Sequence, residues 1–221
     1  MAINMYTMPP TIALFIHQPK CSVQSGNGII KALSPYYRFK IFTKHELEDD
    51  FFNDVDIVAV PGGIGDSDTY RYLMKDQAQL IRNFVANGGK YLGICMGGYW
   101  ADTEYLGLLD SIRVVQYITR PNTDTRRPHA KNINVNWLGK EMNMYFYDGC
   151  TFEGDNTKYE TIATYKNNDP MAIIQNNVGL IGCHPESEKH WYDGYSWMRK
   201  HWHHDTHGEL LLEFVNYLYR K

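Results

Sequence analysis

Several classes of protein are excluded by what this chain of 221 residues lacks. It has no run of about 18 apolar residues, so we expect no transmembrane helix. Residues 1–10 lack a basic segment followed by an apolar one, which predicts no secretory signal. Its formal net charge is -3, which gives no basic footprint for nucleic acid. The composition therefore favours a cytoplasmic globular protein that binds neither nucleic acid nor a membrane.

Cysteine is also scarce. The chain has four cysteines, at scattered spacings: Cys21, Cys95, Cys150 and Cys183. They form neither a C-x-x-C metal motif nor the closely spaced framework of a disulfide-rich domain. Free thiols in a reducing compartment are the simplest interpretation, and the sequence predicts no metal and no cofactor.

Repeats, low-complexity tracts and linkers are absent as well. Hydrophobic residues make up 43% of the chain, which is enough for a sizeable core. We therefore expect a single domain over residues 1–221. The sequence is compatible with a homo-oligomer.

The first half of the chain alternates strand and helix signals. Short apolar or alternating runs predict strands, and 3.6-residue spacing predicts helices. The expected strands are 11–17, 37–43, 55–60 and 90–94, and the expected helices include 28–33 and 72–85. Alternation of this kind predicts a mostly parallel sheet covered by helices on both faces.

The second half changes to short strands separated by turns. The expected strands are 112–119, 133–137, 142–147, 161–165, 171–175 and 178–183. This pattern predicts an antiparallel elaboration. A last helix is expected after Thr206, whose hydroxyl would form a capping box with Glu209.

Cys95 lies in the run Gly93-Ile-Cys-Met-Gly-Gly98, directly after an apolar strand. A strand that turns sharply into a helix at a nucleophile is a nucleophile elbow, and small residues permit the tight turn. The alternative is a buried and inert cysteine. The glycine-rich context favours a reactive thiol that faces a cleft, with the helix N-terminus favouring the thiolate.

His184 and Glu186 follow a second apolar strand, in Gly182-Cys-His-Pro-Glu186. Residues i and i+2 of an extended segment point the same way. His184 could therefore face the thiol while Glu186 orients the imidazole, which completes a catalytic triad. A lone histidine would be better explained as a hydrogen-bonded core residue.

The turn Pro61-Gly62-Gly63 follows the third strand. It is either an ordinary tight turn or part of an oxyanion hole, in which backbone N–H groups meet the charge that develops on a carbonyl oxygen. The candidate donors are the amides of Gly63 and Met96. Gly62 is a candidate substrate contact.

Further candidates lie around this expected cleft. Tyr99, Trp100 and Tyr147 suggest aromatic walls, with Tyr99, Tyr147 and Asp148 as candidate substrate contacts. The run Tyr147-Asp-Gly149 could instead be a hairpin turn, and Cys21 could reach the cleft rim or serve only in packing. Histidines between His201 and His207 lack a zinc-binding spacing, so we interpret them as a solvated loop.

Together these motifs resemble the class I glutamine amidotransferase-like superfamily. Within it the closer match is to the biotin-protein ligase N-terminal domain family. The matching pieces are 58–63, 87–99, 144–149 and 182–186. The resemblance implies a flavodoxin-like three-layer α/β/α sandwich, a Cys95–His184–Glu186 triad, and an oxyanion hole near Gly63 and Met96.

The chain also departs from its relatives. Glutamine amidotransferases usually continue the elbow as Gly-His-Gln, whereas this chain continues as Gly97-Gly-Tyr-Trp100. The run Gly-Arg-Gly-Arg of a biotin ligase catalytic domain is missing. Met96 stands where the thiol-hydrolase and chaperone branch usually has histidine. Glutaminase and ligase activities therefore do not carry over.

Two classes of function follow. The leading hypothesis is a cysteine hydrolase or amidase that acts on a small-molecule or peptide-like amide or ester through an acyl-enzyme. The alternative is a catalytically silent binding or regulatory module, since fold resemblance does not guarantee chemistry. A glutaminase subunit of a separate synthase is a weaker third hypothesis.

Overall fold

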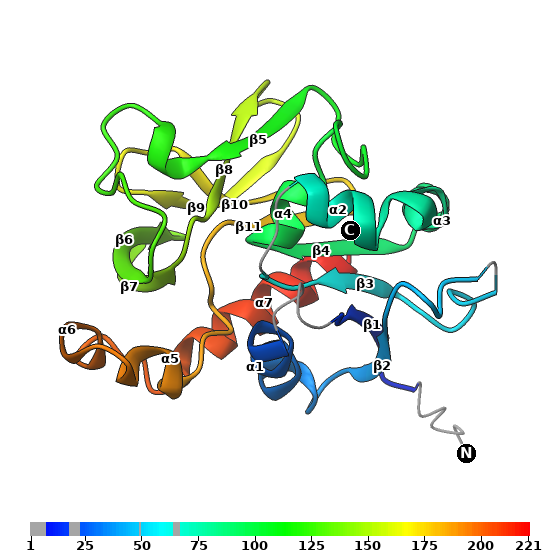
Figure 1. The fold of residues 1–221 in the computed structure, drawn as a ribbon, viewed down its shortest axis with the longest axis horizontal. Helices are drawn as coiled ribbons and strands as arrows, with labels where there is room; N and C mark the ends of the chain where they lie inside the picture. The colour runs from blue at the N-terminus through cyan, green and yellow to red at the C-terminus, as the bar shows by residue number, and fades with distance from the viewer. Residues whose placement is uncertain (1–7, 18–22, 49, 64–66) are drawn as a thin grey trace, which may run out of the picture.

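The computed structural model describes residues 8–17, 23–48, 50–63 and 67–221. Cys21 lies outside the described residues. A nine-stranded sheet runs through the molecule in the order β2-β1-β3-β4-β11-β10-β9-β6-β7, and β5 pairs with β8 in a second, two-stranded sheet (Figure 1). The strands are β1 (Thr11–Phe15), β2 (Arg38–Phe42), β3 (Ile57–Val60), β4 (Lys90–Ile94), β5 (Ile112–Gln116), β6 (Lys131–Trp137), β7 (Lys140–Phe146), β8 (Cys150–Gly154), β9 (Glu160–Tyr165), β10 (Pro170–Gln175) and β11 (Val178–Ile181).

The first half of the chain forms most of the parallel part of the large sheet. Strands β2, β1, β3, β4 and β11 lie side by side, and each pairing among them is parallel. Every residue of β1, β3, β4 and β11 is buried, as expected of strands covered on both faces. Helices α1 (Val23–Leu33) and α7 (Thr206–Tyr219) cover one face, and α2 (Ser67–Leu73), α3 (Ala78–Ala86) and α4 (Met96–Trp100) cover the other.

Alternate residues of β1 point to opposite faces and so enter two different cores. Ile12 and Leu14 pack with α1 and α7, whereas Ala13 and Phe15 pack with α2, α3 and α4. This is the α/β/α sandwich that the sequence predicted, with its parallel central sheet.

The antiparallel elaboration is also confirmed. Strands β10, β9, β6 and β7 follow β11 in the same sheet, and every pairing from β11 outward is antiparallel. The sequence did not predict β8, which pairs with β5 over Ile112–Gln116. A strand was expected over 112–119. It ends at Gln116, and Tyr117–Thr119 form a 3-10 turn.

Two helix predictions were wrong in detail. The helix expected over 72–85 is divided into α2, a 3-10 turn at Lys75–Gln77, and α3; Met74, between α2 and the turn, leaves helical geometry at φ -134°. The capping box is absent. Thr206 is the first residue of α7, and its hydroxyl donates to the His203 carbonyl at 2.7 Å.

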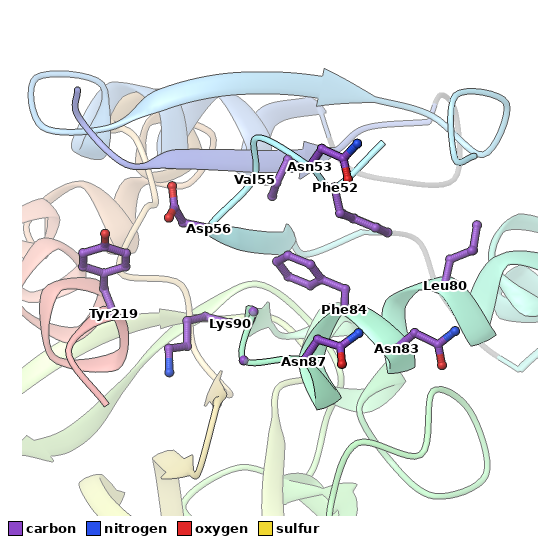
Figure 2. Close-up of a pocket in the computed structure, with 12 residues that line it drawn as sticks. Phe52, Asn53, Val55, Asp56, Leu80, Asn83, Phe84, Asn87, Lys90 and Tyr219 are labelled. Carbon is purple, nitrogen blue, oxygen red and sulfur yellow. The ribbon is translucent and has the colours of Figure 1, made fainter. Parts of the chain in front are cut away.

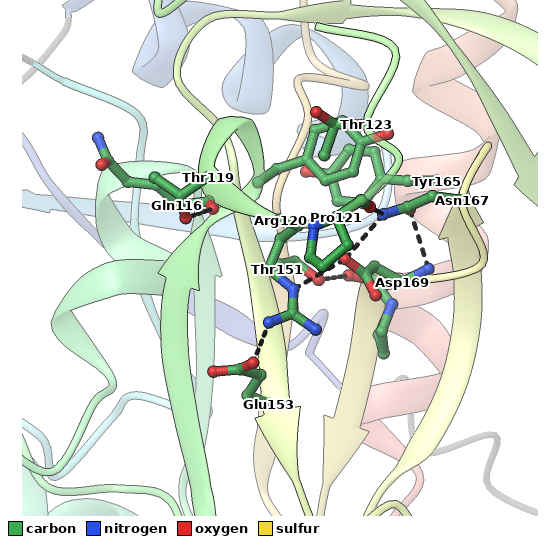
Figure 3. Close-up of polar contacts among 12 residues, drawn as sticks. Gln116, Thr119, Arg120, Pro121, Thr123, Thr151, Glu153, Tyr165, Asn167 and Asp169 are labelled. Carbon is green, nitrogen blue, oxygen red and sulfur yellow. Dashed lines mark hydrogen bonds and ion pairs between the residues drawn. The ribbon is translucent and has the colours of Figure 1, made fainter. Parts of the chain in front are cut away.

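Polar contacts fasten the elaboration together around Arg120 (Figure 3). Its guanidinium pairs with Glu153 of β8. It also pairs, at 3.0 Å, with Asp169, the residue that precedes β10. Asn167 donates to the same Asp169 oxygen at 2.9 Å. These contacts hold β8 against the turn between β9 and β10, and β8 begins with the buried Cys150 beside the elbow.

None of the described helices is long and apolar enough to cross a membrane.

Candidate active site

The elbow at Cys95 has the backbone of a strained turn. Cys95 joins β4 to α4 with φ 49° and ψ -102°, a positive-φ conformation that non-glycine residues rarely adopt. Two residues on, a Cβ on Gly97 would stand 2.0 Å from the Val60 carbonyl oxygen, so only glycine fits there. The α4 helix that follows has five residues.

Sheet register brings the two halves of the site together. Strands β4 and β11 are parallel neighbours with Ile94 opposite Ile181, and the Cys95 N–H donates to the Ile181 carbonyl at 2.8 Å. The segment after β11 therefore starts beside the elbow. Three residues later it places the His184 ring beside Cys95, close enough for the charge of Cys95 to raise the pKa of the imidazole.

The Glu186 carboxylate also contacts the imidazole. His184 Nδ1 is 2.8 Å from Glu186 Oε1, and both side chains are buried. The His184 N–H donates to the Tyr145 carbonyl at 3.0 Å, which fixes the backbone at this point. The structure thus brings Cys95, His184 and Glu186 into one row of contacts.

The electrostatics of this row favour a protonated imidazole. Burial of His184 lowers its pKa, but the charges of Glu186 and Cys95 and their hydrogen bonds outweigh burial and raise its pKa to about 10. An imidazolium at neutral pH is the partner that stabilises a cysteine thiolate.

Ser25 belongs to the site although no sequence motif indicated a role for it. Its hydroxyl donates to Glu186 Oε1 at 2.6 Å and accepts from the Gly62 N–H at 3.0 Å. Ser25 shares the buried stripe of α1 with Ile29 and Leu33. A polar residue on an apolar helix face was therefore the signal that sequence reasoning missed.

The Pro61-Gly62-Gly63 turn packs against the histidine. A Cβ on Gly62 would stand 2.5 Å from His184 Cε1, so Gly62 leaves room for the ring. Gly63 follows at the carboxyl end of β3, and Met96 directly follows Cys95 at the end of the adjacent β4. The Met96 N–H belongs to the first turn of α4 and has no acceptor within that helix. That these two amides bind an oxyanion stays a prediction.

The segment Tyr147–Asp148 contacts the nucleophile. Cys95 Sγ donates to the Tyr147 carbonyl at 3.5 Å, and Tyr99 Oη donates to the Asp148 carbonyl at 3.1 Å. Strands β7 and β8 lie in different sheets, so the hairpin-turn alternative for this segment is wrong.

The side chains of these residues differ in access. The Tyr147 side chain is exposed. The Asp148 carboxylate accepts a hydrogen bond from Gln116 Nε2 at 3.1 Å. Burial raises the pKa of the Asp148 carboxyl and that of the Tyr99 hydroxyl. Trp100 is fully buried against Phe15 and Tyr70, so it is no wall of the cleft.

The histidine-rich stretch is only partly a solvated loop. His203 and His207 are stacked with ring centroids 3.9 Å apart, and burial lowers the pKa of His203 to about 4 and that of His207 to about 3. His203 Nε2 lies 3.1 Å from the Ser187 carbonyl, next to Glu186. Within the described ranges no group of three or more metal-ligating side chains could hold a metal ion.

A cavity of about 730 Å³ lies at the opposite edge of the sheet (Figure 2). Its lining includes Asp56 and Lys90, at the amino ends of β3 and β4, together with the stacked rings of Phe52 and Phe84. Cys95 follows the carboxyl end of β4. This cavity is therefore separate from the candidate active site.

The fold that carries this site is that of the class I glutamine amidotransferase-like proteins, as comparisons with solved structures show. A glutamine amidotransferase from Thermotoga maritima superposes with a TM-score of 0.68 and 13% identity, over 97% of this chain and 100% of that one. A glutamine amidotransferase from Methylobacillus flagellatus superposes with a TM-score of 0.56 and 15% identity, over 88% of this chain and 77% of that one.

At the level of sequence, residues 18–106 match the family model described as "Biotin-protein ligase, N terminal". The resemblance to this family is therefore confirmed over residues 18–106, and the solved structures confirm the expected fold. No curated protein matches the chain. The identities to the solved structures are low enough that they establish the fold alone.

Proposed function

We propose that this protein is a cysteine-dependent hydrolase that cleaves an amide or ester through an acyl-enzyme. The observation that carries the proposal is that the register of β4 and β11 places His184 beside Cys95, with Glu186 Oε1 2.8 Å from His184 Nδ1. These are the nucleophile, the proton carrier and the orienting group of covalent catalysis.

In the first half of the reaction, the Cys95 thiolate attacks the carbonyl carbon of the substrate. The C–S bond forms while the carbonyl electron pair moves to oxygen, beside the amides of Gly63 and Met96. As the oxyanion collapses, the bond to the leaving amine or alcohol breaks. His184 gives its proton to that leaving group, and a thioester remains on Cys95.

In the second half, water attacks the thioester and gives a proton to the now neutral His184. The C–S bond breaks, the acid product leaves, and the thiolate–imidazolium pair is restored. Glu186 holds the imidazole and stabilises its charged form, and Ser25 holds Glu186.

One observation favours the silent binding module as a second candidate. Cys95 is only 7% exposed, and the Tyr147 carbonyl contacts its Sγ at 3.5 Å. In this conformation the thiol is therefore covered on one side by the chain itself.

The test begins with iodoacetamide labelling of Cys95 across pH 5–10, located by mass spectrometry, in wild type and His184→Ala. Fast labelling at neutral pH that depends on His184 supports the proposal. The second step is a panel of amide and ester substrates, with detection of an acyl adduct on Cys95. Slow labelling that is indifferent to His184, or hydrolysis that survives Cys95→Ala, would overturn the proposal.

A further inference from the structure

Aromatic side chains lie next to the candidate nucleophile and its histidine, and others lie on an exposed arm. The arm consists of α5 (Lys189–Asp193) and α6 (Ser196–Arg199), which follow the His-Pro-Glu segment (Figure 1). We call the set the aromatic belt; its members are Tyr145, Tyr147, Trp191, Tyr195 and Trp197.

Three members of the belt lie next to Cys95 or His184. Tyr147 contacts Cys95 Sγ through its carbonyl, while its own side chain is 52% exposed. The ring centroid of Trp191 lies 5.4 Å from that of His184, and the ring centroid of Tyr145 lies 5.8 Å from it. Tyr145 and Trp191 also contact each other, with centroids 5.0 Å apart; Tyr145 is buried behind the partly buried Trp191.

The outer end of the belt is open to solvent. Tyr195 and Trp197 are 45% and 58% exposed, and their ring centroids are 4.8 Å apart. Tyr195 follows Trp191 by four residues in the same arm, so the exposed rings continue along the chain from a ring that contacts His184. Exposed rings that are contiguous with a reactive centre indicate a binding surface.

The charges of the arm are engaged with one another. Lys189 pairs with the Asp193 carboxylate at 2.7 Å, and Arg199 donates to the Asp193 carbonyl at 3.0 Å. These are the three charged residues of the arm between 189 and 199, apart from the histidine at 190. The charged side chains of the arm are therefore already partnered with one another. The aromatic surface beside them suits an uncharged group.

We propose that the aromatic belt binds an uncharged, planar aromatic group of the substrate, held next to the carbonyl that Cys95 attacks. Aromatic rings bind other rings through offset-stacked or edge-to-face contacts as well as through apolar burial. This inference rests on the proposed function, because it names the substrate class of the same site.

The test uses three labels that alkylate Cys95 by the same displacement of iodide: iodoacetamide, N-benzyl-iodoacetamide and N-(cyclohexylmethyl)-iodoacetamide. The last two match in size, but only the benzyl group is planar. We expect the benzyl label to react about tenfold faster than the other two, the factor that corresponds to about 1.4 kcal/mol, and to show saturation with concentration.

Variants assign the preference to the belt. Tyr147→Ala and Trp191→Leu should each bring the benzyl-to-cyclohexylmethyl rate ratio close to one. Tyr36→Ala removes another exposed tyrosine, at 56% exposure in the loop after α1, and should leave the ratio unchanged. If Trp191→Leu does not fold, Trp197→Ala changes an exposed ring of the belt in its place.

The outcomes separate the two proposals. Equal rates for the benzyl and cyclohexylmethyl labels in wild type, or a ratio that survives both belt variants, would overturn the aromatic subsite. Either result could accompany fast, His184-dependent labelling by iodoacetamide, and the proposed hydrolase would then stand. Slow labelling by all three reagents would instead contradict the hydrolase and this inference with it.

Discussion

Ser25 and Glu186 are 161 residues apart in the chain, and their side chains are joined by a hydrogen bond of 2.6 Å. The same serine accepts the Gly62 N–H at 3.0 Å. One hydroxyl of α1 therefore contacts both the carboxylate next to the His184 ring and the turn that packs against that ring.

We expect Ser25→Ala to slow labelling of Cys95 at pH 7 about tenfold, because Glu186 loses a donor and holds His184 less firmly. A buried hydrogen bond to a charged group contributes about 1.5–3 kcal/mol, so a measurable loss of stability should accompany the change. Labelling kinetics and urea denaturation measure both effects. Ser34→Ala, at the exposed end beyond α1, is the matched control. Labelling of Ser25→Ala at the rate of this control would show that the contact is dispensable.

A methyl group at position 62 should act directly on the histidine. Gly62→Ala would place Cβ 2.5 Å from His184 Cε1, closer than real Cβ contacts allow. The ring must move away from the Cys95 thiol, and we expect at least about a tenfold loss in labelling rate at neutral pH. A Cβ at Gly194 meets no atom within 4 Å, so Gly194→Ala should label normally. A wild-type rate for Gly62→Ala would mean that His184 does not control the thiol.

Acid should destabilise the protein through its stacked histidines. Burial lowers the pKa of His203 to about 4 and of His207 to about 3, so the unfolded chain takes up protons below pH about 6.5 while the folded one does not. The stabilisation by neutral histidines is complete above pH about 6.5 and decreases as pH falls towards 4, by about 1.4 kcal/mol per pH unit for each histidine.

Denaturation by urea between pH 4 and 8 would measure this slope. His207→Phe keeps a ring in the stack but removes one titrating group, so its slope should be shallower than that of wild type. His204→Gln changes an exposed neighbour and is the control. Parallel slopes for wild type and His207→Phe would contradict the buried, neutral state of His207.

Arg120 should stabilise the antiparallel elaboration. Its guanidinium, with a side chain 25% exposed, joins Glu153 and Asp169. Because Arg120→Met leaves two partly buried carboxylates without their partner, we expect a loss of about 1–3 kcal/mol in the free energy of unfolding.

Arg113 offers a matched control for that measurement. It pairs with Glu104 at 3.5 Å, and both side chains are mostly exposed. Exposed pairs of this kind contribute little, so Arg113→Met should change stability by less than about 0.5 kcal/mol. Equal effects of the two substitutions would mean that the Arg120 contacts are no stronger than an ordinary surface pair.

The local pattern of the chain was sufficient to predict much of this protein. Fully buried strands such as β3 and β4 are short apolar runs bounded by glycine or proline, and this signal depends on neighbours in the sequence alone. The motifs around Cys95, His184 and Glu186 could be found for the same reason. Each lies directly after such a strand, and parallel strands bring their carboxyl ends to one edge.

Other features were decided by contacts between distant segments. The helical pattern over 72–85 is interrupted at Met74, and His203 and His207 leave solvent because they stack beside Ser187. The Ser25 hydrogen bond needs α1, β3 and the end of β11 to meet in space. Local sequence encodes elements and the ends of strands, but burial and pairing across the chain depend on packing. The sequence by itself therefore determined which side chains could react, and the tertiary structure decided which of them touch.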